Sequence, residues 1–432
     1  MTGAMLIAAC ILLGLNLTVC FHLLLLRRCL QQLADSSPSV KHPPAQQQAV
    51  ADPKTAVILC VRGADPSLAA CLDGLTSQSH RNFTVHAVVD HASDPACPLL
   101  WQMAQSDPRI QIHQITDTPP KHRGLKVTAI LHAVSQLPET VQQVAFIDAD
   151  VIAHPDWLRQ ITGPLANPEI GACTGTRWFV PDQRSLGSLV RKEWNFYATA
   201  FMVRHQILWG GSFSMRACEL KSAVEQGLWE HKLCEDTCLG DFFRNRGRRT
   251  VLVPAVAMIN PECCGLAGAA AFIRRQQVFT WLYSSAARRI IGFAAIFTAL
   301  CLISPVFAAV VILTGSPAAA CVSLAACLLL QVAVVHLEWF GHGMAARLRT
   351  AAASAAPQPS TRLWRLYLAQ LLCAAISLAA CLQAVLTTRL SWRGIDYQIS
   401  HRPLRVQMLK YQPFSATQSR EQLPAGTGPM SI

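Results

Sequence analysis

The chain has 432 residues, of which 52% are hydrophobic and only 14% are charged, and its mean hydropathy is +0.29. This composition is too apolar for an ordinary soluble protein and favours a membrane protein. The formal net charge of +12 would suit a nucleic-acid partner, but the basic residues gather beside apolar runs, as at Arg27-Arg28 and Arg288-Arg289; this pattern is typical of membrane flanks, and we expect no nucleic-acid partner.

The first predicted element is an apolar run from Met5 to Leu26, which is long enough to span a bilayer. No small-residue cleavage site precedes Arg27-Arg28, so residues 1–30 are predicted to be a retained transmembrane anchor rather than a removed signal peptide. Because Lys and Arg follow this run and none precede it, the positive-inside rule places the next domain in the cytosol. Residues 31–53, rich in Pro, Gln and Ser, are predicted to be a linker.

Residues 54–267 alternate short β-rich runs with helical patterns, which predicts an α/β domain with a mostly parallel, Rossmann-like sheet and crossover helices. The candidate strands are residues 57–61, 83–89, 110–112 and 144–147. Two of them end in Asp90 and Asp148. Ligands of open α/β sheets bind beyond the carboxyl ends of the strands, so these acids lie where a site is expected.

Two acidic motifs can carry chemistry. Asp148-Ala149-Asp150 ends an apolar strand, and its two carboxylates would suit Mg²⁺ or Mn²⁺ shared with phosphate oxygens; an Asp-rich turn is the alternative. Glu235-Asp236 stands at a predicted helix start, where acids face the positive end of the helix dipole. This pair is either an ordinary first-turn pair or the place of a general base that activates an acceptor hydroxyl.

The C-terminal third is predicted to lie at or in the membrane. Residues 268–289 mix basic and apolar side chains, as an interfacial helix on the cytosolic leaflet does. Apolar runs at about residues 290–314, 318–340 and 366–386 predict transmembrane helices within 290–390. With the anchor they make four spans, which would put the basic tail, residues 391–432, outside, whereas its Arg and Lys residues favour the inside. Trp392-Arg393 is interpreted as an interfacial anchor or as a WRG-type tail.

Six segments over about residues 54–285, taken in order, carry a family resemblance: Val-Val-Asp90-His-Ala-Ser-Asp94, Arg123-Gly124-Leu125-Lys126, Asp148-Ala-Asp150, Gly-Gly-Ser-Phe-Ser-Met-Arg216, Glu235-Asp236 and Gln277-Val-Phe-Thr-Trp281. The chain resembles a membrane-bound family 2 glycosyltransferase with a GT-A fold, and most closely the ceramide-glucosyltransferase-like branch. The resemblance implies donor contacts from Asp90, Asp94, Lys126 and Asp148, and a divalent metal, Mg²⁺ or Mn²⁺, held by Asp148 and Asp150.

The same resemblance implies that Asp236 acts as the general base of a single inverting displacement at the anomeric carbon. Glu235, Gln277 and Trp281 would flank the acceptor or donor pocket. One position departs from the family's QxxRW motif, because Thr280 occupies the place of its Arg. Arg274 or Arg275 could supply the missing charge.

These observations predict an integral, multi-pass membrane enzyme with a cytosolic catalytic domain. Its expected reaction moves a hexose, from UDP-glucose or a close relative, to the hydroxyl of a membrane lipid such as ceramide. A processive polysaccharide synthase of the same family is one alternative, although the C-terminal membrane region is short for a translocation channel. A catalytically inert membrane scaffold is another, against which the intact acidic motifs speak. The Ala-rich composition favours a bacterial inner membrane.

Overall fold

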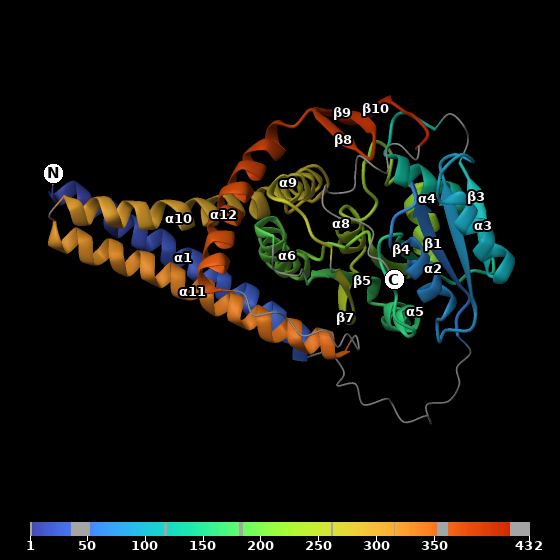
Figure 1. Ribbon diagram of the computed structural model, residues 1–432, viewed down its shortest axis with the longest axis horizontal. Helices are drawn as coiled ribbons and strands as arrows, with labels where there is room; N and C mark the ends of the chain where they lie inside the picture. Colours follow the sequence, from blue (N-terminus) through green and yellow to red (C-terminus); the bar gives the residue numbers. More distant parts are fainter. Residues whose placement is uncertain are drawn as a thin grey trace.

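The computed structural model describes residues 2–35, 52–115, 119–180, 185–260, 262–314, 316–351 and 362–414. A central sheet with helices on both faces forms a rounded domain, and a bundle of long helices projects from one side of it (Figure 1). Four helices are long and apolar enough to cross a membrane. The predicted fold class, a mostly parallel α/β domain with membrane-length helices, is therefore confirmed.

The sheet of this domain has seven strands, which are β1 (Thr55–Val61), β2 (Phe83–Val89), β3 (Ile110–Gln114), β4 (Gln143–Asp148), β5 (Ile170–Phe179), β6 (Ser212–Arg216) and β7 (Arg249–Asn260). Their order is β3-β2-β1-β4-β6-β5-β7, and only β6 runs antiparallel to its neighbours. All four predicted strands are observed. The carboxyl ends of β1, β2 and β4 consequently meet at one edge of the sheet, which is where the acidic motifs lie.

Helices cover both faces of the sheet, and they are α2 (Leu68–Thr76), α3 (Cys97–Ser106), α4 (Leu125–Ser135), α5 (Trp157–Thr162), α6 (Leu186–His205), α7 (Ala217–Glu225), α8 (Leu239–Arg244) and α9 (Leu266–Tyr283). Successive residues of β1 point to opposite faces, so Val57 packs with Trp157 of α5 while Ile58 packs with Ile130 of α4. Burial on both faces explains why the strands have continuous apolar sequences.

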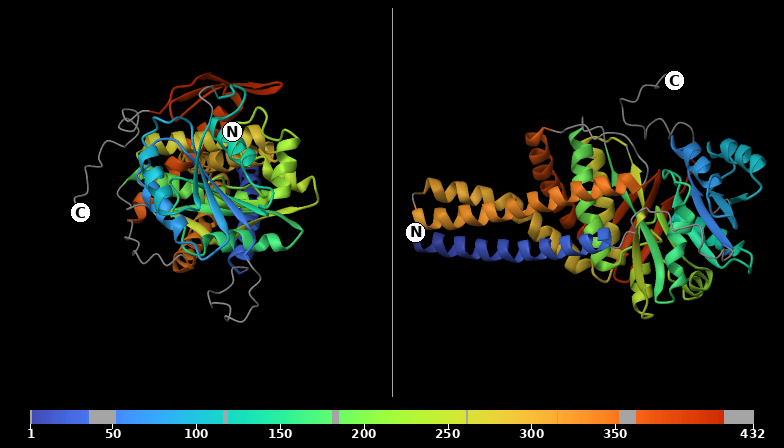
Figure 2. Two further views of the ribbon diagram at one scale, coloured as in Figure 1. Left: turned by 90° about the vertical axis from the view of Figure 1, so that its right-hand side faces the viewer. Right: turned by 90° about the horizontal axis from the view of Figure 1, so that it is seen from below.

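Three long helices form the projecting bundle: α1 (Thr2–Asp35), α10 (Ala287–Leu313) and α11 (Pro317–Ala351). At its far end Ala9 of α1 packs with Val311 and Ala319, so the chain leaves the domain along α10 and returns along α11 (Figures 1 and 2). Inside the bundle, Asn16 donates hydrogen bonds to the Ser304 hydroxyl (3.1 Å) and the Ala326 carbonyl (2.9 Å). Such bonds fix the register of helices in an apolar medium.

The fourth apolar helix, α12 (Leu363–Leu386), runs across the direction of the other three (Figures 1 and 2). Its small residues Ala369 and Cys373 pack against Leu189 of α6 and Ile273 of α9, and Ala384 near its end joins the core beneath the sheet. Because α12 packs against α6, α9 and α10, it lies where the α/β domain and the bundle meet and does not extend away from the domain as α1, α10 and α11 do (Figure 1).

After α12 the chain forms a three-stranded antiparallel sheet, β8 (Arg389–Trp392), β9 (Ile395–His401) and β10 (Leu404–Lys410), within the region expected to be a basic tail. Tyr397 and Ile399 belong to the same buried cluster as Leu125 of α4, and the Leu125 N–H donates to the Tyr397 hydroxyl (3.1 Å). In β9 and β10 every second residue is apolar, and the residues between them include Arg, Gln and Ser, so the sequence did not stand out as a pair of strands. The three-stranded sheet therefore packs onto the α/β domain.

Candidate active site

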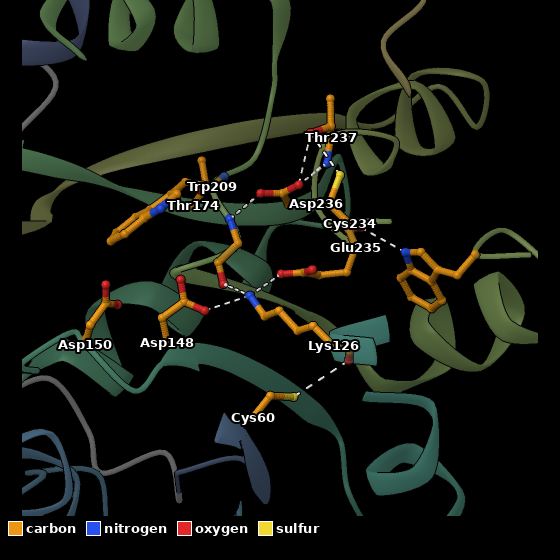
Figure 3. A network of polar contacts seen from close by, with 12 residues as sticks. Cys60, Lys126, Asp148, Asp150, Thr174, Trp209, Cys234, Glu235, Asp236 and Thr237 are labelled. Atoms are coloured by element: carbon orange, nitrogen blue, oxygen red, sulfur yellow. Dashed lines mark hydrogen bonds and ion pairs between the residues drawn. The ribbon is translucent and has the colours of Figure 1, made fainter. Parts of the chain in front are cut away.

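Lys126 lies at the centre of the acidic motifs. It is the second residue of α4, and its ammonium nitrogen lies 2.7 Å from Asp148 Oδ1, 2.5 Å from Glu235 Oε1 and 3.3 Å from the Gly210 carbonyl oxygen (Figure 3). Burial disfavours this charge, but the two carboxylates outweigh burial and hold the pKa of Lys126 above its usual value. Lys126 therefore joins the end of β4 to the acid pair before α8.

The Glu235-Asp236 pair lies in a bend just before α8, which begins at Leu239, and not within the helix's first turn as expected. Asp236 instead accepts hydrogen bonds from two separate segments. Its Oδ2 accepts from the Gly210 N–H (2.6 Å), and its Oδ1 accepts from the Thr237 N–H (2.6 Å) and hydroxyl (3.0 Å). These bonds fix the carboxylate against the turn that precedes β6.

The carboxylate of Glu235 is deeply buried. The residue is 2% exposed, and burial raises its pKa to about 7 even though Lys126 opposes that shift. A β-carbon at position 210 would collide with the carboxylates of both Glu235 and Asp236, so a glycine is required where the turn passes over the pair. Gly210 thus allows the main chain to approach two acids at once.

Asp148 and Asp150 form the second group of acids. The Arg177 guanidinium of β5 lies 2.9 Å from Asp150 Oδ1 and 3.9 Å from Asp148 Oδ2, so both carboxylates already share one cation. Burial would raise the pKa of Asp148, but Lys126 and Arg177 outweigh burial and lower it. Two ionised carboxylates at a strand end fit a divalent cation of the Mg²⁺ or Mn²⁺ type.

Within the described residues no group of three or more His, Cys, Asp or Glu side chains is arranged to hold a metal. Asp148 and Asp150 could therefore supply only part of a coordination shell. Phosphate oxygens and water would have to complete it, as is usual for Mg²⁺ at phosphate sites.

Asp90 and Asp94 have different surroundings although four positions separate them. Asp90, 3% exposed, pairs with Arg62 and accepts from the Tyr411 hydroxyl (3.2 Å), while its buried Oδ1 has no hydrogen-bond partner among the described residues. Asp94 accepts from the N–H groups of Gly63 (2.8 Å) and Ala96 (2.8 Å). Asp90 can thus accept a further hydrogen bond, whereas Asp94 holds a loop together.

Two cavities adjoin these residues. The first, which we call the charged cavity, has a volume of about 430 Å³ and is lined by Arg62, Asp90, Lys126, Asp148, Asp150, Arg177, Arg275 and Arg393 together with apolar residues. The second, the apolar cavity, of about 260 Å³, extends from Glu235 and Asp236 to Phe293 and Phe297 of α10 and Leu26 of α1. Lys126, Asp148, Arg177, Arg275 and Trp392 line both, so the cavities meet at the centre of the site.

The structure brings most of the predicted site residues together. Asp90, Lys126, Asp148 and Asp150 line the charged cavity, and Glu235, Asp236 and Gln277 line the apolar one. Two predicted residues lie elsewhere: Asp94 is absent from the lining of either cavity, and Trp281 packs against the core beneath the sheet.

Sequence reasoning missed Arg177 and the position of Arg393 in the site. A signal for Arg177 existed, because it is the only charged residue in the otherwise uncharged strand β5, and charged side chains are rarely buried without a partner. Arg393 gave no comparable signal, since a basic residue after an apolar run is ordinary at a membrane surface.

Comparison with known proteins identifies a family. The sequence model of glycosyl transferase family 21 matches residues 12–404. A search of curated proteins finds no match. Among solved structures, a mannosyltransferase from Pyrobaculum calidifontis in complex with GDP-Man and Mn²⁺ is similar, with 17% identity and a TM-score of 0.48 over 89% of this chain and 99% of that chain. A glucosyl-3-phosphoglycerate synthase from Mycobacterium tuberculosis with Mn²⁺ and UDP-Glc shows 17% identity and a TM-score of 0.36, over 54% of this chain and 79% of that chain.

Proposed function

The chain belongs to glycosyl transferase family 21, and from this premise we propose that it transfers a hexose from a UDP-sugar to the hydroxyl of a membrane lipid, with ceramide as the leading acceptor. The observation that carries the proposal is the meeting of two unlike cavities. The charged one suits a nucleotide diphosphate, and the apolar one runs from the acid pair to helices that are long enough to cross a membrane. A polar donor and a lipid acceptor would meet between them.

The donor half of the proposal rests on Asp90, Asp148 and Asp150. The buried Oδ1 of Asp90, which lacks a partner, would accept the N–H of a nucleobase such as uracil. Asp148 and Asp150 would hold a divalent cation together with the diphosphate. When bound, that cation would neutralise charge on the leaving diphosphate.

The acceptor half rests on Asp236. In the proposed reaction its carboxylate takes the proton of the acceptor hydroxyl, and the acceptor oxygen bonds to the anomeric carbon as the bond to the nucleoside diphosphate breaks. The attack comes from the side opposite the leaving group, so the configuration is inverted. Hydrogen bonds from Gly210 and Thr237 orient the carboxylate, and Lys126 holds Glu235 beside it.

The proposed membrane arrangement has three spans, α1, α10 and α11, with α12 lying at the cytosolic surface beside α9. Arg27-Arg28 follow the apolar part of α1, which favours the cytosol for the domain end of the bundle. The chain then returns along α11 before α12 begins, so the tail sheet stays on the same side as the α/β domain. A bacterial inner membrane remains the compartment that the composition favours.

A transfer assay on the full chain in nanodiscs tests the proposal. Radiolabelled UDP-glucose, UDP-galactose and UDP-N-acetylglucosamine are offered with ceramide, diacylglycerol or total lipid extract, with Mn²⁺ or EDTA. We expect an organic-phase product carrying a single sugar. Label in a high-molecular-weight aqueous polymer would identify a polysaccharide synthase instead, and no incorporation into either phase would favour an inert scaffold.

A further inference from the structure

Five basic side chains line the charged cavity against three acidic ones: Arg62, Lys126, Arg177, Arg275 and Arg393 face Asp90, Asp148 and Asp150. The first three cations each pair with one of the three acids, at Asp90, Asp148 and Asp150 respectively. The two remaining cations, Arg275 of α9 and Arg393 of the turn between β8 and β9, pair with none of the acids that line the cavity.

Arg275 is half-buried where the two cavities meet. Among the residues that the structure describes, no carboxylate lies within ion-pair distance of its guanidinium. Burial, with Arg177 and Arg393 nearby, lowers the pKa of Arg275 to about 10, and Asp148 and Asp150 offset only part of this shift. A buried cation beside other cations is costly until an anion neutralises it.

Arg393 and Gly394 form the two-residue turn between β8 and β9, and both have positive φ, +46° and +75°. Such turns favour Asn-Gly, and a left-handed arginine costs about 1 kcal/mol or more. Arg62 holds the turn in place, because its side chain donates to the Arg393 carbonyl (3.2 Å) while Arg393 Nη1 donates to the Arg62 carbonyl (2.5 Å). The nearest carboxylate, Asp65, is 3.7 Å from Arg393 Nη2. Strain retained at a cavity wall is typical of ligand sites.

We propose that Arg275 and Arg393 bind the diphosphate of the sugar donor, one from the helix before the membrane bundle and the other from the sheet after it. This inference rests on the proposed function, of which it names the diphosphate-binding residues. A diphosphate diester carries two negative charges, and guanidinium groups bind phosphate oxygens with paired N–H donors.

The experiment measures binding to the full chain in nanodiscs by calorimetry, with UDP, UMP and inorganic pyrophosphate as probes, each in Mn²⁺ and in EDTA. Arg275→Ala and Arg393→Ala should each weaken UDP and pyrophosphate binding about tenfold to a hundredfold. The preference for UDP over UMP should fall by a similar factor, and the effect should persist in EDTA. Arg→Lys at either position should restore part of the affinity, because it keeps the charge but not the paired donors.

Arg274→Ala and Arg405→Ala are the matched controls. Both residues are exposed on the same elements, α9 and the tail sheet, and neither lines a cavity. They should bind all three probes as the wild type does, and all variants should melt within a few degrees of it. At each arginine, comparing the alanine variant with the lysine variant distinguishes a folding defect from the loss of a contact with phosphate.

Unchanged UDP and pyrophosphate binding in Arg275→Ala and Arg393→Ala would overturn the proposal and leave the nucleotide-sugar reaction standing. If the wild-type protein binds pyrophosphate but not UDP, the assignment of Arg275 and Arg393 to the diphosphate would stand and the proposal of a UDP-sugar donor would fail. If the wild-type protein binds neither UDP nor pyrophosphate, both the assignment of the two arginines and the proposed UDP-sugar donor would fail.

Discussion

The sharpest test of the proposed reaction is Asp236→Asn. The substitution is nearly isosteric, but the amide cannot take a proton from an acceptor hydroxyl. General-base catalysis contributes about 10²- to 10⁴-fold, or roughly 3–5 kcal/mol of barrier, and we expect turnover to fall by this factor. Donor binding should change little, because Asp236 lines the apolar cavity and not the charged one.

The structure also predicts what Asp236→Asn costs in stability. Both sides of the native carboxylate face donors, the Gly210 N–H at Oδ2 and the Thr237 N–H and hydroxyl at Oδ1. An amide has a single oxygen, so its NH₂ group must oppose one of these donors whichever way it turns. One donor left unsatisfied costs about 1–3 kcal/mol, which should appear as a lower melting temperature.

Thr237→Val is the control that separates the two effects. It removes only the hydroxyl donor at 3.0 Å and leaves the carboxylate able to accept a proton. We expect a modest loss of stability and retention of most of the transfer rate. The assay is lipid transfer at saturating donor, with UDP binding and melting temperature measured on the same samples. An Asp236→Asn protein that turns over at the wild-type rate would remove Asp236 from the mechanism.

Three further predictions concern the acids around this base. Asp150→Ala should weaken Mn²⁺-dependent UDP binding at least about tenfold, and unchanged Mn²⁺ dependence in calorimetry contradicts the metal assignment. Gly210→Ala places a methyl group against Glu235 and Asp236, so melting temperature and transfer rate should both fall, with about 1–3 kcal/mol lost to overpacking; wild-type values of both would argue against this close approach. The pKa of Glu235 is about 7 in the folded protein, against a reference value of 4.5, so the folded state holds a proton that the unfolded state releases as the pH rises. Between about pH 4.5 and 7 the wild type should therefore lose up to about 3 kcal/mol of unfolding free energy relative to Glu235→Gln. Unfolding titrations at both pH values measure this change, and a constant difference would show that Glu235 does not titrate in that window.

The strands and the position of the acidic motifs could be predicted because both depend on local sequence. β1, β2 and β4 are buried on both faces and have continuous apolar runs, and Asp90 and Asp148 end or follow two of them. Parallel strands bring their carboxyl ends to one edge, so separate motifs could be assigned to one site before the structure was known.

The contacts among these motifs could not be predicted in the same way. Lys126 reaches Asp148 and Glu235 only because Gly124, at the start of α4, lies against the segment around Leu233; its N–H donates to the Lys232 carbonyl (2.8 Å). Arg177 lies beside Asp150 because β6 runs antiparallel between β4 and β5. Both contacts depend on the pairing of distant segments, which periodicity does not encode.

The largest gap between sequence and structure concerns α12 and the tail. Hydropathy records how apolar a helix is but not where it lies, and α12 packs against α6 and α9 of the α/β domain as well as against α10. Counting it as a span would put Arg393 across the membrane from Asp148, whereas both residues line one cavity. The tail sheet and the α/β domain lie at the same end of the helical bundle (Figure 1). The three-span arrangement proposed above agrees both with the basic residues of the tail and with the shared cavity, whereas an arrangement that counts every apolar run as a span agrees with neither.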